Sequence, residues 1–303
     1  MILSASRRTD IPAFYSKWLV NRLRAGYVLT RNPVNHSQIS KIVLSPDIID
    51  CIVFWTKDPA NMLPHLSAIE DMQYRYYFQF TLTPYDNKIE RNMRCKKEII
   101  QTFIELGKRI GRDRLLWRYD PIILNDTISI SSHKKWFKEM CAVLHPYTNS
   151  VTISFVDLYA KVKTPLVKSI GKAEEHQLAG IFSAIAREYG LTIKACCEQT
   201  DFSPYGIVGA SCIDRETIEN ICGCKIVAPQ DKNQRKACGC IESVDIGAYN
   251  TCKNGCVYCY ANFSEKTVIS NWEKHDPDGE FLLGKLSCTD KVTERKIKSI
   301  KSA

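Results

Sequence analysis

The stretches CIVFWT at residues 51–56 and YRYYFQFTL at residues 74–82 decide the fold class of this protein. Both are apolar on nearly every residue, which is typical of strands buried on both faces of a parallel sheet. Five more short runs are rich in β-forming residues: ILSAS (2–6), YVLTR (27–31), RLLWRYD (114–120), SVTISFVD (150–157) and LTIKACC (191–197). The first two thirds of the chain therefore predict a sheet of six or seven strands.

Helical patterns lie between most of these runs. One covers residues 12–26, with Asp10 as its expected cap and Gly26 as its end. The others cover roughly 88–107, 132–144 and 173–190. Strands that alternate with helices predict parallel βαβ units. This number of units favours an α/β fold built as a complete or partial (β/α) TIM-type barrel, with a doubly wound open sheet as the alternative.

The pattern divides the chain into three parts. Residues 1–197 form the βα-repeat barrel, and residues 198–265 form a cysteine-rich cap that completes it. Residues 266–303 are polar and basic, and we expect a peripheral tail. Within the middle part, ESVDIGAY (242–249) is expected to form one last short strand.

Composition limits the classes of function. The 303 residues are 45% hydrophobic and 25% charged, which is ordinary for a globular protein and excludes a disordered one. No apolar run approaches the length of about 18–20 residues that spans a membrane. The opening MILSASRRTD does not have the pattern of a secretory signal, so we expect a cytoplasmic protein. The net charge of +9 leaves a nucleic-acid partner open.

Cysteine usage points to metal. Ten of the 14 cysteines lie in the 64 residues from Cys196 to Cys259. In a reducing compartment such a density favours metal ligation over disulfides. The four outside this segment are expected to be buried as small hydrophobic residues: Cys51, Cys95, Cys141 and Cys288.

The segment YNTCKNGCVYCYAN at residues 249–262 carries the chemistry. It places Cys252, Cys256 and Cys259 at the spacing C-x3-C-x2-C. Three thiolates can hold three irons of a four-iron cluster and leave the fourth iron open to a small molecule. A zinc site would need a fourth ligand from elsewhere in the chain. Zinc and a plain electron-transfer cluster stay open as alternatives.

This spacing, with Tyr258 before the third cysteine, resembles the signature of the radical S-adenosylmethionine superfamily. The longer text CxxxCxYCYA looks like the spore photoproduct lyase branch. The resemblance implies a [4Fe-4S] cluster, S-adenosylmethionine on its open iron, and reductive cleavage to a 5′-deoxyadenosyl radical. It also implies a reductant such as flavodoxin or ferredoxin. Tyr258 and Tyr260 are then expected to shield the cluster, with ordinary packing as the alternative. Asn262 is expected to contact the adenine or its helix, and a helix is expected to begin at residues 260–262.

In that superfamily the motif follows the first barrel strand, whereas here it follows all the βα units. A circularly permuted barrel resolves the difference if residues 242–248 form a strand beside residues 2–6. Texts like ILSASRRTDIPAFY (2–15) and QR-x2-CGC-x2-S-x-DIG-x-Y-x-TC-x3-C-x-YCYAN (234–262) also resemble an uncharacterised bacterial family, domain of unknown function number eighteen-forty-eight. That resemblance implies the fold and the cofactor but no substrate.

A second metal site is predicted from the remaining cysteines. The preferred ligands end a strand, lie in the tight text GASC, or share one loop: Cys197, Cys212, Cys238 and Cys240. They are expected to hold an auxiliary iron–sulfur cluster or zinc. The alternative is that several of them are simply buried thiols.

Polar residues gather where the predicted strands end, which is where barrel enzymes bind their ligands. Arg7, Arg8 and Arg118 are candidates for the carboxylate of S-adenosylmethionine or for a substrate anion. Asp120 and Asp157 are candidates for ribose hydroxyls. A purely structural pair of Arg118 with Asp120 is the alternative.

The sequence thus predicts a radical S-adenosylmethionine enzyme with an unknown substrate. Two other functions stay open. One is a nucleic-acid-binding protein stabilised by zinc or a cluster, and the other is a radical enzyme that repairs nucleic acid.

Overall fold

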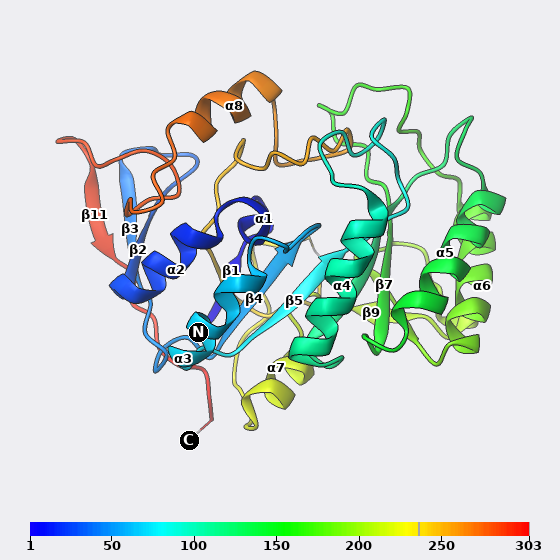
Figure 1. Ribbon diagram of the computed structural model, residues 1–303, viewed down its shortest axis with the longest axis horizontal. Coiled ribbons are helices and arrows are strands. Elements are labelled where there is room, and N and C mark those ends of the chain that lie inside the picture. Colours follow the sequence, from blue (N-terminus) through cyan, green and yellow to red (C-terminus); the bar gives the residue numbers. More distant parts are fainter. Residues whose placement is uncertain (236, 303) are drawn as a thin grey trace.

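The computed structural model describes residues 1–235 and 237–302, and its main feature is one parallel sheet. Eight strands form it in the order β10-β1-β4-β5-β6-β7-β8-β9 (Figure 1). Every neighbouring pair is parallel. The strands are β10 (Val244–Asp245), β1 (Ile2–Ala5), β4 (Cys51–Thr56), β5 (Tyr76–Thr81), β6 (Leu115–Ile122), β7 (Ser150–Phe155), β8 (Thr192–Cys196) and β9 (Val208–Ala210).

The strand order confirms the parallel βα arrangement. From β1 to β9 the strands follow the chain, without the reversal that defines a doubly wound sheet. The segment predicted at 242–249 forms β10 and pairs with β1, so the C-terminal motif joins the sheet beside its first strand. The fold is barrel-like. No pairing between β9 and β10 joins the two edges within the described residues, so full closure stays a prediction.

Eight α-helices connect or flank these strands in the described chain. They are α1 (Ile11–Phe14), α2 (Ser16–Ala25), α3 (Leu66–Asp71), α4 (Lys96–Ile110), α5 (Ile130–Leu144), α6 (Lys172–Glu188), α7 (Arg215–Cys222) and α8 (Glu265–Glu273). Helices α4, α5 and α6 lie along one side of the sheet, at the right of Figure 1. None of the described helices is long and apolar enough to cross a membrane.

Local signals set the helix ends. The Asp10 side chain accepts a hydrogen bond from the Ala13 N–H at 3.0 Å, and Gly26 ends α2 with a φ of 77°. Helix α4 begins at Lys96, later than expected, because residues 86–90 form a turn. The helix expected at residues 260–262 begins at Glu265, where Ser264 caps it.

One predicted barrel strand belongs elsewhere. Residues 27–31 form β2 (Tyr27–Arg31) of a separate sheet, where β2 is antiparallel to β3 (Gln38–Val43) and β3 is parallel to β11 (Lys291–Glu294). A short apolar run does not reveal which sheet it joins. The segment 266–303, expected as a basic tail, therefore contains a helix and a strand. Its Lys298 carbonyl also accepts a hydrogen bond from the N-terminal amine at 2.9 Å.

Alternation along the strands separates two interiors. On β5, Tyr76 and Phe78 pack into the main hydrophobic core, beneath the helices. Their neighbours Tyr77 and Gln79 point to the other face of the sheet, where both donate hydrogen bonds to the Cys212 carbonyl, at 2.9 and 2.7 Å. The inner face therefore mixes polar groups with cysteines.

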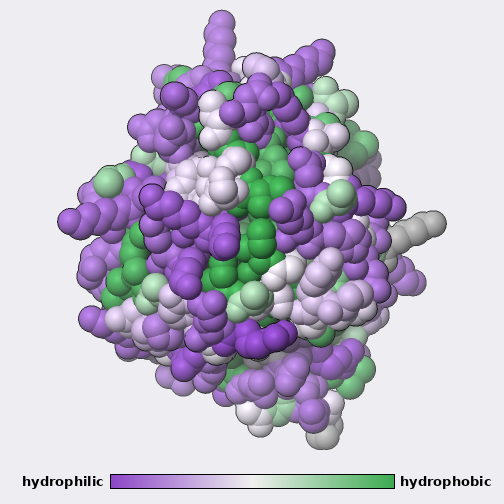
Figure 2. All heavy atoms as spheres, turned by 90° about the vertical axis from the view of Figure 1, so that its right-hand side faces the viewer, coloured by the Kyte–Doolittle hydropathy of each residue, from purple (hydrophilic) through white to green (hydrophobic). Residues whose placement is uncertain are grey.

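Aromatic stacking fixes the helices on the sheet. Trp117 of β6 stacks on Phe137 of α5 with ring centroids 5.5 Å apart, and Phe137 stacks on Phe182 of α6 at 4.2 Å. The outer side formed by these helices is mostly hydrophilic, with an apolar strip across it (Figure 2).

Two of the four scattered cysteines, Cys51 and Cys141, are buried as expected, but Cys95 and Cys288 are exposed. Those two lie in surface loops, which sequence alone did not indicate.

Asp245 joins the C-terminal motif to the first strand. Its carboxylate accepts hydrogen bonds from the hydroxyls of Ser4 at 3.0 Å and Ser6 at 2.6 Å, and from the Arg7 N–H at 2.9 Å. It also pairs with the Arg8 guanidinium at 2.9 Å. Burial alone would raise the pKa of Asp245, but Arg8 and these hydrogen bonds lower it below its usual value.

The Asp245→Asn substitution should weaken this joint, because the amide keeps the shape but not the charge. We expect a loss of about 1.5–3 kcal/mol in the free energy of unfolding, measured by urea denaturation. The matched control is Asp126→Asn, at a highly exposed ion pair with Lys168, where a change within about 0.5 kcal/mol is expected. Equal effects of the two substitutions would contradict the role given to Asp245.

Candidate functional site

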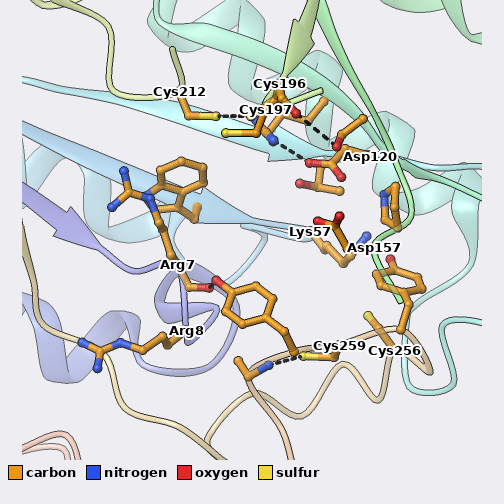
Figure 3. A pocket seen from close by; sticks show the side chains of 18 of the residues that line it. Arg7, Arg8, Lys57, Asp120, Asp157, Cys196, Cys197, Cys212, Cys256 and Cys259 are labelled. Carbon is orange, nitrogen blue, oxygen red and sulfur yellow. Dashed lines mark hydrogen bonds and ion pairs between the residues drawn. The ribbon is translucent and has the colours of Figure 1, made fainter. Parts of the chain in front are cut away.

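A cavity of about 510 Å³ lies at the carboxyl ends of the strands. This volume is in the range typical of small-molecule sites. Residues at or just after the carboxyl ends of β1, β4, β6, β7 and β8 line it, together with residues 233–235, Cys238, Cys240 and the loop 252–261. Figure 3 shows cysteines on two separate sides of this cavity, with charged side chains between them. Strand ends thus meet the cysteine-rich segment here, as predicted.

The three motif cysteines share one wall of the cavity. Cys252, Cys256 and Cys259 all line it and are partly exposed. The loop that carries them is fastened at Thr251, whose carbonyl accepts a hydrogen bond from the Tyr15 hydroxyl at 2.7 Å. The Thr251 hydroxyl contacts that of Thr9 at 2.5 Å. The N-terminal segment therefore holds the loop in place.

A segment from another part of the chain runs beside the motif loop. The Val257 N–H donates to the Ile89 carbonyl at 3.0 Å, and the Asn92 N–H donates to the Asn254 carbonyl at 3.2 Å. Between them, Gly255 has a φ of 66°, and a Cβ there would lie 2.8 Å from the Asn92 side chain. Glycine is therefore required where the two segments approach.

Glu90 is the charged centre of this contact. It is 1% exposed and accepts hydrogen bonds from Lys57 Nζ at 2.7 Å, Thr83 Oγ1 at 2.7 Å and the Tyr258 hydroxyl at 2.5 Å. It also pairs with Lys96. Burial raises the pKa of Glu90, but the two lysines outweigh it and lower the pKa to about 2. Tyr258 is thus fixed by a buried carboxylate.

The motif thiols differ in their surroundings. Burial raises the pKa of Cys252 well above its ordinary value and that of Cys256 to about 12, where Lys57 opposes the rise. The Ala261 N–H donates to Cys259 Sγ at 3.3 Å. A thiol must lose its proton to bind a metal, so an ammonium and an N–H beside the sulfurs favour the ligating form.

The triad offers three thiol ligands to one cavity. As the side chains stand, no group of three or more Cys, His, Asp or Glu residues in the described chain surrounds a point as metal ligands. The three sulfurs nevertheless open into one cavity that is large enough for a cluster and a small molecule. No histidine lines that cavity as a fourth ligand within the described ranges. This donor set suits a centre with an open position better than a closed zinc site.

Asn262 lies behind the motif loop. Its Nδ2 donates to the Cys252 carbonyl at 2.7 Å, and its Oδ1 is buried without a hydrogen-bond partner among the described residues. Asn262 is not among the described residues that line the cavity, so it braces the first cysteine of the motif. A contact with adenine stays a prediction.

The predicted charged residues all reach the cavity, mostly as ion pairs. Arg118 binds Asp120 at 2.5 Å, the pair that sequence analysis kept as the structural alternative. Asp157 binds Arg235, also at 2.5 Å. Arg8 is engaged with Asp245. Their roles toward a ligand stay predictions.

Arg7 differs from these residues. Its guanidinium lies over the Trp55 ring at 5.0 Å, and Arg118 lies over the same ring at 5.7 Å. No carboxylate lies within ion-pair distance of Arg7 in the described residues. Its neighbours are Cys240 and Cys212.

The second cysteine set also meets at the cavity, with one member that was not predicted. Cys197, Cys212, Cys238 and Cys240 all line it. Cys196 joins them, since its Sγ lies 3.2 Å from that of Cys212. Sharing of protons between neighbouring thiols lowers the pKa of Cys196 and Cys240 and raises the pKa of the other three.

Sequence analysis missed Glu90 and Asp245 because their partners are distant in the chain. Glu90 lies in a turn without a motif, and its contact Tyr258 is 168 residues away. Asp245 pairs across 237 residues with Arg8. Asp245 lies in the strand-like text SVDIG, whereas Glu90 stands among polar residues and gave no signal.

This geometry defines a parallel βα protein of barrel-like type, with a cysteine-lined cavity at the carboxyl ends of its strands. Within that class, the chain belongs to the family described as "Domain of unknown function (DUF1848)", whose model matches residues 2–261. The match confirms the family resemblance. Comparison with curated proteins finds no match.

One solved structure shows how distant the structural relatives are. It is described as a "putative alpha-L-fucosidase" from Bacteroides thetaiotaomicron and is 12% identical, covering 74% of this chain and 83% of that chain. The TM-score is 0.26, which carries no argument about function.

The Glu90→Gln substitution should loosen the motif loop, because it leaves two buried lysines without a counter-charge. We expect about 3–5 kcal/mol less free energy of unfolding near neutral pH. A carboxyl whose pKa falls from 4.5 to about 2 on folding stabilises the protein above pH 4.5 and loses this effect as the pH falls towards 2. The difference between wild type and variant in urea unfolding should therefore shrink as the pH falls through this window.

The control is Glu188→Gln, since Glu188 forms a half-exposed pair with Lys138. Its effect should stay below about 1 kcal/mol. The free energies of unfolding of wild type and Glu90→Gln are compared at each pH. If their difference does not change as the pH falls, the role given to the Glu90 carboxylate is wrong.

Proposed function

We propose that this protein is a radical S-adenosylmethionine enzyme whose cluster is held by Cys252, Cys256 and Cys259. The observation that carries the proposal is the placement of three motif thiols on one wall of a cavity at the strand ends. Strand β10 pairs with β1 immediately before the motif, so the loop begins where a permuted barrel requires it. The family match gives no substrate, so the reaction beyond the cofactor is not assigned.

When bound, such a cluster supplies an electron and an open iron position for S-adenosylmethionine. The chain's own residues supply position and charge. Lys57, buried between Glu90 and Cys256, offsets the negative charge that ligating thiolates bring. The N–H of Ala261 on Cys259 adds a hydrogen bond to one of the ligating sulfurs.

Aromatic residues would keep water from the reacting atoms. Tyr258 lies against the triad and is fixed by Glu90. The Tyr260 hydroxyl donates to the Arg7 carbonyl at 2.6 Å, and its ring lies 5.6 Å from that of Tyr159. Exclusion of water protects reactive intermediates from side reactions. We assign this shielding to Tyr258 and Tyr260.

The polar wall suits a small zwitterionic ligand. Asp120 and Asp157 line the cavity and each is already paired with an arginine, so their remaining lone pairs can accept hydroxyl donors such as ribose. The arginines here are largely paired with carboxylates. A paired wall lacks the excess basic charge that a nucleic-acid site presents, so we favour a small-molecule cavity.

The test is anaerobic purification followed by iron and sulfide analysis and electron paramagnetic resonance of the reduced protein. We expect about four irons assigned to the triad per chain, with a signal that shifts on adding S-adenosylmethionine. Dithionite-reduced protein should release 5′-deoxyadenosine. Cys256→Ala should lose the triad's iron, the spectral shift and the product.

Cys141→Ala is the matched control, because Cys141 is buried in the core far from the cavity lining. It should keep the iron, the shift and the product. Reconstituted wild-type protein that binds no iron, or binds iron but shows no response to S-adenosylmethionine, would overturn the proposal.

A further inference from the structure

Five buried or half-buried thiols form a continuous cluster away from the motif loop. Cys196 contacts Cys212 at 3.2 Å between the sulfurs. Cys212 also neighbours Cys240, Cys240 neighbours Cys238, and Cys238 neighbours Cys197. Cys197 in turn neighbours Cys196, so the five residues form a ring of neighbours. We call these residues the five-cysteine cluster.

Three separate chain segments are built to bring the cluster together. Cys196 ends strand β8, Cys212 follows β9, and Cys238 and Cys240 lie in a later loop. The last two segments touch closely, because a Cβ at Gly239 would lie 2.4 Å from the Ser211 hydroxyl. A larger residue between the two cysteines would therefore force the Ser211 side chain to move.

Hydrogen bonds from side-chain and backbone donors hold the cluster on the sheet. Tyr77 and Gln79 of β5 both donate to the Cys212 carbonyl, at 2.9 and 2.7 Å. The Ile213 N–H donates to Cys240 Sγ at 3.3 Å. Each sulfur turns about a single side-chain torsion, so the thiols can reorient while the backbone stays fixed.

Two guanidinium groups lie against these sulfurs. Arg118 is 5% exposed and donates from Nη1 to Cys212 Sγ at 2.8 Å, while its Nη2 binds Asp120. Arg7 neighbours Cys240 and Cys212, and its Nη2 is buried without a hydrogen-bond partner among the described residues. A buried cation is costly unless an anion faces it.

Neutral thiols do not meet this requirement. Asp120 serves Arg118, and Asp245, whose charge also acts on Arg7, is paired with Arg8. Besides the Trp55 ring, the Arg7 guanidinium therefore has cysteine sulfurs as its nearest unpaired partners. Disulfides would remove the charge altogether, and the 3.2 Å between Cys196 and Cys212 is well above the bonded length of about 2.05 Å. Four thiolates on a zinc ion or on a four-iron cluster carry a net negative charge, which Arg7 and Arg118 would balance.

From this cluster and its two arginines, we infer that four of the five thiols ligate a second metal centre on the wall of the cavity that faces the triad. The chemistry required is a thiophilic metal, supplied as zinc(II) or as an iron–sulfur cluster. Figure 3 shows Cys196, Cys197 and Cys212 on one side of the cavity and Cys256 and Cys259 on the other. A ligand in the cavity would lie between the two centres.

The experiment separates the two sites by substitution. Wild type, Cys256→Ala and the double variant Cys212→Ala/Cys240→Ala are purified anaerobically and reconstituted with iron and sulfide or with zinc(II) alone. Iron, sulfide and zinc per chain are then measured. We expect Cys256→Ala to keep about one zinc or about four irons, and the double variant to lose that metal but keep the triad's iron.

Two controls match the substituted thiols. Cys141→Ala/Cys288→Ser removes one buried and one exposed cysteine outside the cluster and should bind as much metal as wild type. Zinc retained by Cys256→Ala would identify a zinc centre, and iron with sulfide would identify a cluster; both outcomes support the inference. Cys256→Ala that retains neither, or a double variant that binds as much as its control, would overturn it.

A second measurement does not depend on the variants folding. In native metal-loaded wild type, alkylation followed by peptide mapping should leave four of the five cysteines unmodified until a chelator is added, while exposed Cys95 and Cys288 react at once. Equal alkylation of the cluster with and without chelator in the metal-loaded protein would contradict the inference. The proposed function can fail separately, since loss of triad iron leaves this result unchanged.

Discussion

The hydrogen-bonded ion pair between Asp245 and Arg8 is the constraint on which the rest of the site depends. A motif near the end of the chain must be placed beside the first strand, and no covalent connection does this. The Asp245 carboxylate instead collects Ser4, Ser6 and the Arg7 N–H from that strand and the residues after it. After β10 the chain continues into the motif loop, whose cysteines line the cavity. Charge and hydrogen bonding thus join the C-terminal motif segment to the first strand at this point.

A second buried carboxylate repeats this logic on the other side of the motif. Glu90 connects Tyr258 to Lys57 and Lys96, so the loop is braced both from β10 and from the turn after β5. Buried charges of this kind contribute little net stability compared with apolar packing, but removing one partner is costly. Their main effect is to fix the position of the motif loop. A fixed loop keeps the three cysteine sulfurs in a constant arrangement.

The cavity between the two cysteine groups is lined by polar and cysteine side chains. The inner face of the sheet carries Gln79, Arg118 and Cys196 where an ordinary barrel would pack branched aliphatic residues. These groups are tolerated because each has a partner: a carbonyl, a carboxylate or a sulfur. Arg7 lacks a carboxylate partner in the described residues and is placed beside sulfur instead. The positive charges on the inner face of the sheet therefore lie beside the carboxylate and sulfur groups that line the cavity.

The sequence alone determined the βα pattern, the strand at residues 242–249 beside residues 2–6, the family and the spacing of the three motif cysteines. These are local properties: periodicity, caps and short spacings are legible within a few residues. It did not determine that residues 27–31 leave the main sheet, nor that Cys196 joins the second cysteine group. Glu90 and Asp245 were likewise invisible, because an isolated acidic residue has no pattern. Only tertiary structure decides such pairs, since the electrostatic cost of burial is settled by whichever distant segment brings the opposite charge.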